Sequence, residues 1–298
     1  MPQATGHKIK NIPICLVVVA AAILSQTGAL AVEQKWQEAG SEHFIVYFFD
    51  NEKFAKEVLD KAEIYYKDIA VFLGYPRYSE FWIWDNRAKI HIYKKHQDYI
   101  KATGAPEWTQ GLANYKARSI SSYAWSKGFT DSLLPHEMAH LIFRDFVGFK
   151  GEIPLWLDEG VAQWAEAAKR NQMKKMAKDY YMSDKLLLLT DMMKLNINNI
   201  KDDNKIYLSI RRTLTTDNKE AVLIITLDEL INTYYLQGFS LAGFLIERYD
   251  STDFAHFCRQ LRDGKSLEEA LRFAYPTAFR SLNELELRWR KYLEDEKV

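Results

Sequence analysis

Cysteine is scarce in this chain, with two residues in 298. Cys15 lies in an apolar segment near the amino terminus, and Cys258 lies close to the other end. If that apolar segment is removed on export, Cys258 has no possible partner, which excludes an internal disulfide framework. A single remaining cysteine is most simply a buried apolar residue.

Excess charge and sequence repetition are absent as well. The chain has 40 basic and 40 acidic residues. This balance gives no indication that nucleic acid or an anionic surface is a partner. No internal repeat or low-complexity tract is present, and the content of 48% hydrophobic and 14% aromatic residues is sufficient for a sizeable core. The composition therefore predicts a globular protein with one large domain or two small ones.

A long hydrophobic run is also missing. The apolar segment 12–24 has 13 residues, whereas a membrane-spanning helix needs about 20. Lys8 and Lys10 precede it, and Ala29-Leu30-Ala31 follows as a small-residue cleavage pattern. These features predict a secretory signal peptide over residues 1–31. We expect export to the periplasm or the medium without stable membrane insertion after cleavage; an uncleaved anchor is the alternative.

The most informative segment is the pentapeptide His136-Glu137-Met138-Ala139-His140, which lies in an apolar stretch typical of a helix. Residues four apart share one helix face, so both imidazoles can reach a single ion. Glu137 is offset around the helix, where it can face a water beside that ion. Two neutral nitrogen ligands and a carboxylate base are what a zinc hydrolase requires. A solvated amphipathic helix without metal is the alternative.

A catalytic zinc ion usually takes three protein ligands, so a third is expected. Eighteen residues separate His140 from Glu159, which stands in Trp156-Leu157-Asp158-Glu159-Gly160. This spacing and context resemble the gluzincin metallopeptidases, closest to the peptidase-MA-like and aminopeptidase-N-like domains. The resemblance implies one zinc ion per chain, bound by His136, His140 and Glu159, with Glu137 as general base. A purely structural zinc, or a metal site without turnover, remains an alternative.

The segment Tyr235-Leu236-Gln237-Gly238 extends the resemblance. Aminopeptidase-N-like enzymes carry a Y-x-x-G segment at a comparable place, and its tyrosine donates a hydrogen bond to the oxyanion of the tetrahedral intermediate. The resemblance therefore implies this role for Tyr235. Tyr234 is the alternate, and a core or interface tyrosine is the simpler interpretation of either residue.

Outer carboxylates usually orient metal-binding imidazoles. Asp158, Gln163 and Glu166 lie close enough to Glu159 in sequence to reach a ligand. For each of the three, solvent exposure or pairing along a helix is the favoured interpretation.

One segment departs from the aminopeptidase pattern. Those enzymes carry a G-x-M-E-N strand whose Glu holds the amino terminus of the substrate. The comparable segment here, Gly111-Leu112-Ala113-Asn114-Tyr115, has no Glu. It can still pair with an extended substrate through its backbone, but the anchor for a free amino terminus is missing. We therefore expect an endopeptidase rather than an aminopeptidase.

The order of patterns predicts an α+β fold: a small mixed sheet with one long helix, followed by a mostly helical half that carries the zinc site. The expected strands lie at 41–49, 81–84, 89–93 and within 111–125, and the expected helices before the metal site lie at 51–73 and 96–102. The metal-binding helix is expected to begin with Thr130, Asp131 or Ser132 as its cap, and the next helix near Pro154. Later helices are expected at 227–249, 251–261, 266–274 and 281–293.

The resemblance implies a peptidase-MA-like catalytic domain over residues 32–293, with a sheet-containing lobe at 41–125 and a helical lobe at 126–293. Residues 169–225 are rich in Lys, Asn and Asp and do not follow the family pattern. We interpret them as a variable insertion near the cleft. A lid and a solvated excursion without catalytic role are equally open.

The expected function is zinc-dependent hydrolysis of peptide bonds in exported or envelope peptides and proteins. A catalytically silent zinc-binding domain that binds envelope peptides is one alternative. A non-peptidase hydrolase on the same scaffold is the other, because fold does not dictate substrate. The sequence indicates neither the oligomeric state nor the identity of the substrate.

Overall fold

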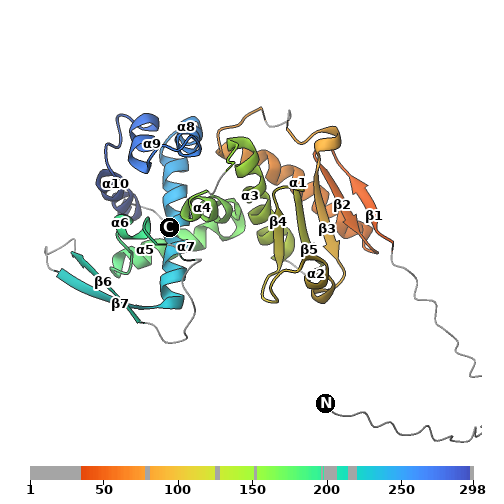
Figure 1. The fold of residues 1–298 in the computed structure, drawn as a ribbon, viewed down its shortest axis with the longest axis horizontal. Coiled ribbons are helices and arrows are strands. Elements are labelled where there is room, and N and C mark those ends of the chain that lie inside the picture. The colour runs from red at the N-terminus through yellow and green to blue at the C-terminus, as the bar shows by residue number, and fades with distance from the viewer. Residues whose placement is uncertain are drawn as a thin grey trace, which may run out of the picture. The chain divides into compact units, whose positions relative to one another are not determined.

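The computed structural model describes residues 35–77, 81–124, 128–150, 153–195, 197, 207–213 and 220–295, with only the backbone for 207–213 and 220–224. Its amino-terminal part is a five-stranded mixed sheet in the order β1-β2-β3-β5-β4 (Figure 1). The strands are β1 (Gln37–Gly40), β2 (Phe44–Phe48), β3 (Ala88–Tyr93), β4 (Gly111–Asn114) and β5 (Ser119–Tyr123). The three central strands are parallel, and the edge strands β1 and β4 are antiparallel to their neighbours.

The long helix α1 (Glu52–Phe72) lies between the parallel strands β2 and β3 along the chain. It begins at Asn51, whose side chain accepts a hydrogen bond from the Phe54 amide at 3.1 Å, as a helix N-cap does. Gly74, with φ at +82°, lies just after its end. The apolar face of α1 is buried against β2 and α3, so the helix covers one face of the sheet.

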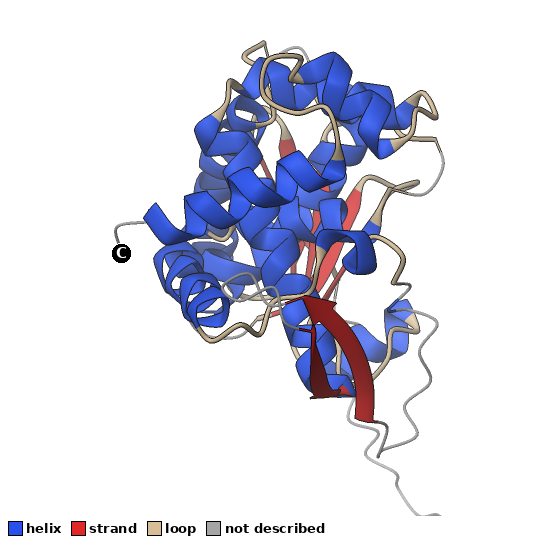
Figure 2. Cartoon of the chain, turned by 90° about the vertical axis from the view of Figure 1, so that its left-hand side faces the viewer, coloured by secondary structure: helices blue, strands red, loops and turns tan. Residues whose placement is uncertain are grey.

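The rest of the described chain is mainly helical. After the short α2 (His96–Thr103), the helices are α3 (Leu134–Val147), α4 (Leu155–Ala165), α5 (Ala167–Met182), α6 (Leu189–Met192), α7 (Leu227–Arg248), α8 (Ser251–Arg262), α9 (Leu267–Ala274) and α10 (Leu282–Asp295). A separate hairpin, β6 (Tyr207–Thr213) with β7 (Glu220–Thr226), precedes α7; it stands apart from the large sheet in Figure 1 and lies in front of it in Figure 2. One continuous apolar core joins the sheet, α1, α3, α4 and α7 to α10.

The expected α+β architecture, a small mixed sheet followed by helices, is confirmed. The predicted strand at 81–84 is wrong. Trp82 and Trp84 have φ of 52° and 55°, which is incompatible with an extended backbone. A bend and the short 3-10 helix Trp84–Asn86 stand there instead. The Trp82 side chain is buried and donates to Asp145 at 2.8 Å.

Two other expectations concern the ends of elements. The cap expected for the metal-binding helix at Thr130, Asp131 or Ser132 is wrong, because a π-helical turn, Phe129–Leu133, runs into α3 without a side-chain cap. The predicted start of the next helix near Pro154 is confirmed.

The signal-peptide prediction for residues 1–31 lies outside the described residues. Within the described part of the chain, no helix combines the length and apolar character that crossing a membrane requires.

Candidate metal centre

Helix α3 carries both motif histidines on one face. Pro135 lies in its first turn, where the missing amide hydrogen costs nothing. Gly148, with φ of +81°, ends the helix and lets the chain turn back toward α4. The opposite face of α3 is apolar and buried in the core. Burial of that face holds the imidazole-bearing face toward α4, where Glu159 lies.

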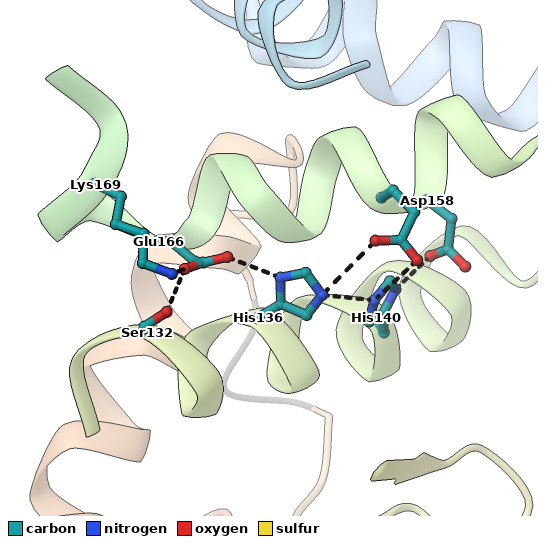
Figure 3. A network of polar contacts seen from close by, with 7 residues as sticks. Ser132, His136, His140, Asp158, Glu166 and Lys169 are labelled. Carbon is teal, nitrogen blue, oxygen red and sulfur yellow. Dashed lines mark hydrogen bonds and ion pairs between the residues drawn. The ribbon is translucent and has the colours of Figure 1, made fainter. Parts of the chain in front are cut away.

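Three ligand atoms converge between α3 and α4 (Figure 3). The Nε2 atoms of His136 and His140 are 3.3 Å apart. The Glu159 carboxylate lies 3.8 Å from His136 Nε2 and 4.0 Å from His140 Nε2. Suitable ligand atoms of the three residues all fall within 4.8 Å of one another. The structure therefore brings together the three residues that the sequence singled out as ligands.

Each imidazole also forms a hydrogen bond with a carboxylate other than that of Glu159. His140 Nδ1 donates to Asp158 at 2.8 Å, and His136 Nδ1 donates to Glu166 at 3.0 Å (Figure 3). The favoured interpretation of Asp158 and Glu166 as solvent-exposed or merely helix-paired residues is therefore wrong. Asp158 precedes Glu159 on α4, and Glu166 stands at the break between α4 and α5. Among the described residues no hydrogen bond joins Gln163 to either imidazole.

These outer contacts determine which ring nitrogens face inward. An ionised carboxylate only accepts hydrogen bonds, so Nδ1 of each histidine must carry the proton. In the neutral imidazoles the two Nε2 lone pairs then point toward each other across 3.3 Å, with the Glu159 carboxylate beside them. Such an arrangement is repulsive unless one ring takes up a second proton or a metal ion lies between the three groups.

The spacing of the donors suits a small divalent cation. Ligands of a tetrahedral zinc ion, at bond lengths of about 2.05 Å, lie about 3.4 Å from one another. The separation of the two Nε2 atoms, 3.3 Å, matches this distance, and the Glu159 oxygens lie slightly further out. Two imidazoles and one carboxylate form a donor set that leaves a fourth position for water or substrate. The group could therefore hold a metal ion.

The charges around the pair favour a cation as well. Burial disfavours protonation of His140, but its hydrogen bond to Asp158 and the charges of Asp158, Glu159 and Glu137 outweigh burial and raise its pKa to about 9. Burial raises the pKa of Glu159, against the lowering effect of the two histidines. The same negative field that holds a proton on His140 stabilises a metal ion at this place.

Glu166 is fixed more firmly than its position at a helix break suggests. Ser132, from the π-helical turn before α3, donates to its carboxylate, and Lys169 lies 2.6 Å from the same oxygen. Although burial raises the pKa of Glu166, the hydrogen bonds from His136, Lys169 and Ser132 lower it to about 2. Glu166 therefore stays ionised and keeps the His136 ring in one orientation.

Glu137 faces a cavity next to the ligands. A cavity of about 530 Å³ is lined by Glu137, His136 and Glu166, and on its other side by Trp108 to Gly111. Gly111 begins β4, an edge strand of the sheet. It lies so close to Leu133 that a Cβ atom added to Gly111 would be 2.9 Å from the Leu133 side chain. The edge strand and the carboxylate predicted as general base thus border one space.

The two tyrosines of α7 line different cavities. Tyr235 is half-buried and lines a cavity of about 480 Å³ together with His136, Gln163 and Glu166. Burial and the charge of Glu159 raise its pKa, so its hydroxyl remains a donor at neutral pH. Tyr234 is 2% exposed and lines a different cavity; burial raises its pKa to about 12, against a hydrogen bond with the Trp156 backbone. Of the two, Tyr235 shares a cavity with a ligand.

His43 lies outside this group: its side chain is buried and contacts Glu63 of α1 at 2.7 Å. Comparison with known proteins adds no family assignment: a scan against protein families found no match, and a search of curated proteins found none either.

Proposed function

We propose that this protein is a zinc-dependent hydrolase of peptide bonds, and more specifically an endopeptidase of the gluzincin type. The observation that supports this proposal is the convergence of His136, His140 and Glu159, with both imidazoles oriented by Asp158 and Glu166. When bound by these three residues, zinc would polarise the scissile carbonyl and make a nearby water more acidic.

The protein's own residues would supply the proton transfers. Glu137 borders the same cavity as His136. From there its carboxylate can accept a proton from the attacking water and pass it to the leaving amine. Tyr235, protonated at neutral pH and facing the cavity that His136 also lines, can donate to the developing oxyanion.

The edge strand supports an extended peptide as substrate. One edge of β4 pairs with β5, and its other edge has no strand partner among the described residues. Gly111 lines the cavity that holds Glu137, so a peptide added to β4 through backbone hydrogen bonds would pass the general base. No Glu stands in Gly111–Asn114 to hold a free amino terminus, which favours internal cleavage.

The test is Glu137→Gln in the zinc-loaded protein. The substitution removes the proton acceptor but no ligand, so we expect unchanged zinc content and a loss of peptide cleavage of about 10³-fold or more, measured by mass spectrometry of a peptide library. The matched control is Glu57→Gln on the exposed face of α1, which should keep full activity.

Full activity of Glu137→Gln would refute the general-base assignment. Zinc binding by the unaltered protein without cleavage of any peptide, together with tight peptide binding, would instead identify a silent binding domain. Hydrolysis of ester or amide compounds that a chelator abolishes, in the absence of peptide cleavage, would identify a different hydrolase.

A further inference from the structure

A larger cavity, separate from the one that Glu137 lines, lies beside the candidate metal centre. Its volume is about 920 Å³, and it adjoins the metal centre through Asp158, whose carboxylate holds His140. Tyr234 also lines it. Aliphatic and aromatic side chains form much of its wall: Ile153, Leu155, Trp156, Met193, Leu195, Leu261 and Leu267.

Three cations from separate parts of the chain converge on this cavity: Arg144 on α3, Lys194 after α6 and Lys265 between α8 and α9. Among the described residues of its wall, Asp158 is the one acid, and it is already engaged by His140 at 2.8 Å. Neither lysine forms an ion pair with any residue that the structure describes. The described part of the wall therefore carries more basic than acidic side chains, although the whole chain is neutral.

Arg144 links this charge to the metal-binding helix. His136, His140 and Arg144 are spaced by four residues on α3 and so lie along one face. At 1.5 Å per residue, Arg144 is about 6 Å along the axis from His140. Its guanidinium lies over the Tyr115 ring, 4.4 Å from the centroid, which fixes it at the end of β4.

That distance corresponds to about two residues of extended peptide, at about 3.3 Å each. A substrate whose scissile carbonyl lay at the metal centre would place a group one or two residues away beside Arg144. Lys194 and Lys265 are exposed at the rim of the cavity, where they can approach the same group.

We propose that this cavity is a subsite for a carboxylate of the substrate, supplied either by the carboxyl terminus of a peptide or by an Asp or Glu side chain. The inference rests on the proposed peptide hydrolysis, since it assigns the chemistry of one part of that substrate. The apolar wall accommodates the remainder of the side chain or the chain end.

The test measures binding without cleavage, using zinc-loaded Glu137→Gln and three libraries of fluorescent octapeptides. The first library has a free carboxyl terminus and no Asp or Glu; the second is identical but amidated; the third is amidated and contains Glu. We expect the first or the third to bind at least fivefold more tightly than the second, and the one that does identifies the source of the carboxylate.

The double variant Lys194→Ala/Lys265→Ala should lose most of this preference. The matched control, Lys67→Ala/Lys175→Ala, removes two exposed lysines outside the cavity and should retain it. Raising the salt from about 50 to 500 mM should weaken binding of the preferred library, because partly exposed charge pairs are screened.

Equal binding of all three libraries, or an unchanged preference in the lysine double variant, would overturn the subsite. These results are separable from the peptidase proposal. Cleavage of acidic and amidated peptides at equal rates would leave the peptidase standing and remove the subsite. A carboxylate preference in binding, with no cleavage by the unaltered protein, would leave the subsite standing and remove the peptidase proposal.

Discussion

Carboxylates behind the imidazoles are the residues on which the geometry of the centre depends most directly. A lone histidine can rotate and carry its proton on either nitrogen. Asp158 and Glu166 remove both freedoms, because each accepts from Nδ1 and turns Nε2 toward Glu159. Such outer contacts commonly contribute one or two orders of magnitude in metal affinity.

Asp158→Asn tests whether one of these carboxylates orients its imidazole. An amide of the same shape can present its oxygen to His140 but lacks the charge, so we expect zinc affinity to fall about 10- to 100-fold with little change in stability. Competition with a chromophoric chelator measures the affinity. Asp60→Asn on α1 is exposed and serves as the control; equal affinity in the two variants would contradict the orienting role.

Glu63 gives a prediction that is independent of any metal. Burial raises its pKa, but hydrogen bonds from the His43 backbone at 2.9 Å and side chain at 2.7 Å bring the pKa below the usual 4.5. The folded-state pKa of Glu63 is below its unfolded value. Ionised Glu63 therefore stabilises the fold fully above the unfolded pKa, and this contribution is lost as the pH falls through the folded-state pKa.

Glu63→Gln should therefore lower the free energy of unfolding by about 1 kcal/mol at pH 7. The difference from the unaltered protein should narrow as the pH falls below 4.5. Urea titrations at pH 7, 5 and 4 measure it, with Glu57→Gln as an exposed control. A difference that stays constant over this range would mean that the charge of Glu63 plays no part.

At the scale of elements, the crossing of α4 and α7 positions Glu159. A Cβ atom on Gly160 would lie 2.4 Å from the Gly238 carbonyl oxygen, and one on Gly238 would lie 2.8 Å from the Trp156 carbonyl oxygen. The two helix backbones are therefore in direct contact. Gly238 is the glycine of the Tyr-x-x-Gly segment, and its role here is to allow α4 to approach the helix that carries Tyr235.

Gly160→Ala should push α4 away from α7. We expect a loss of about 3 kcal/mol in stability, from overpacking against backbone, and weaker zinc binding because Glu159 is adjacent. Thermal unfolding and chelator competition measure the two effects. Gly104→Ala is the control, since its Cβ meets nothing within 4 Å and its cost is limited to the left-handed backbone, about 1 kcal/mol; similar results for both variants would contradict the close-contact explanation.

Elements with a strong local pattern could be predicted from the sequence. The helix at Glu52–Phe72 has an Asn cap and a glycine just beyond its end, and α8 to α10 have regular apolar spacing. The turn at Trp82 could not, because a run of large apolar residues also suits a strand, and the hydrogen bond from the buried Trp82 to Asp145 joins residues 63 apart in the sequence. The entry into α3 likewise depends on the contact between Ser132 and Glu166, which lie 34 residues apart.

At the scale of the whole molecule, the candidate metal centre joins elements that are far apart in the sequence: α3, α4 and the part of α7 that carries Tyr235. A metal ion that binds only when these segments are assembled must stabilise the assembled form. The proposed zinc site therefore predicts a link between metal content and global stability.

Zinc at about 100 times its dissociation constant should add about 2.7 kcal/mol, which raises the melting temperature by about 5 °C or more for a chain of this size. Differential scanning calorimetry with and without a chelator measures the shift. Glu137→Gln should show the full shift and His140→Ala should show none. A shift that persists in His140→Ala would argue against the proposed ligands.

The amino-acid sequence by itself determined which side chains can do chemistry here: two histidines and a glutamate in one helical segment, and a second glutamate, Glu159, separated from His140 by eighteen residues. The histidine pair is visible because spacing along a helix converts directly into a shared face. Tertiary structure alone decided that Asp158 and Glu166 hold the imidazoles, and that Arg144, Lys194 and Lys265 meet at one cavity. These contacts arise from the angles at which helices pack, and the packing of distant segments leaves no periodic signal in the sequence.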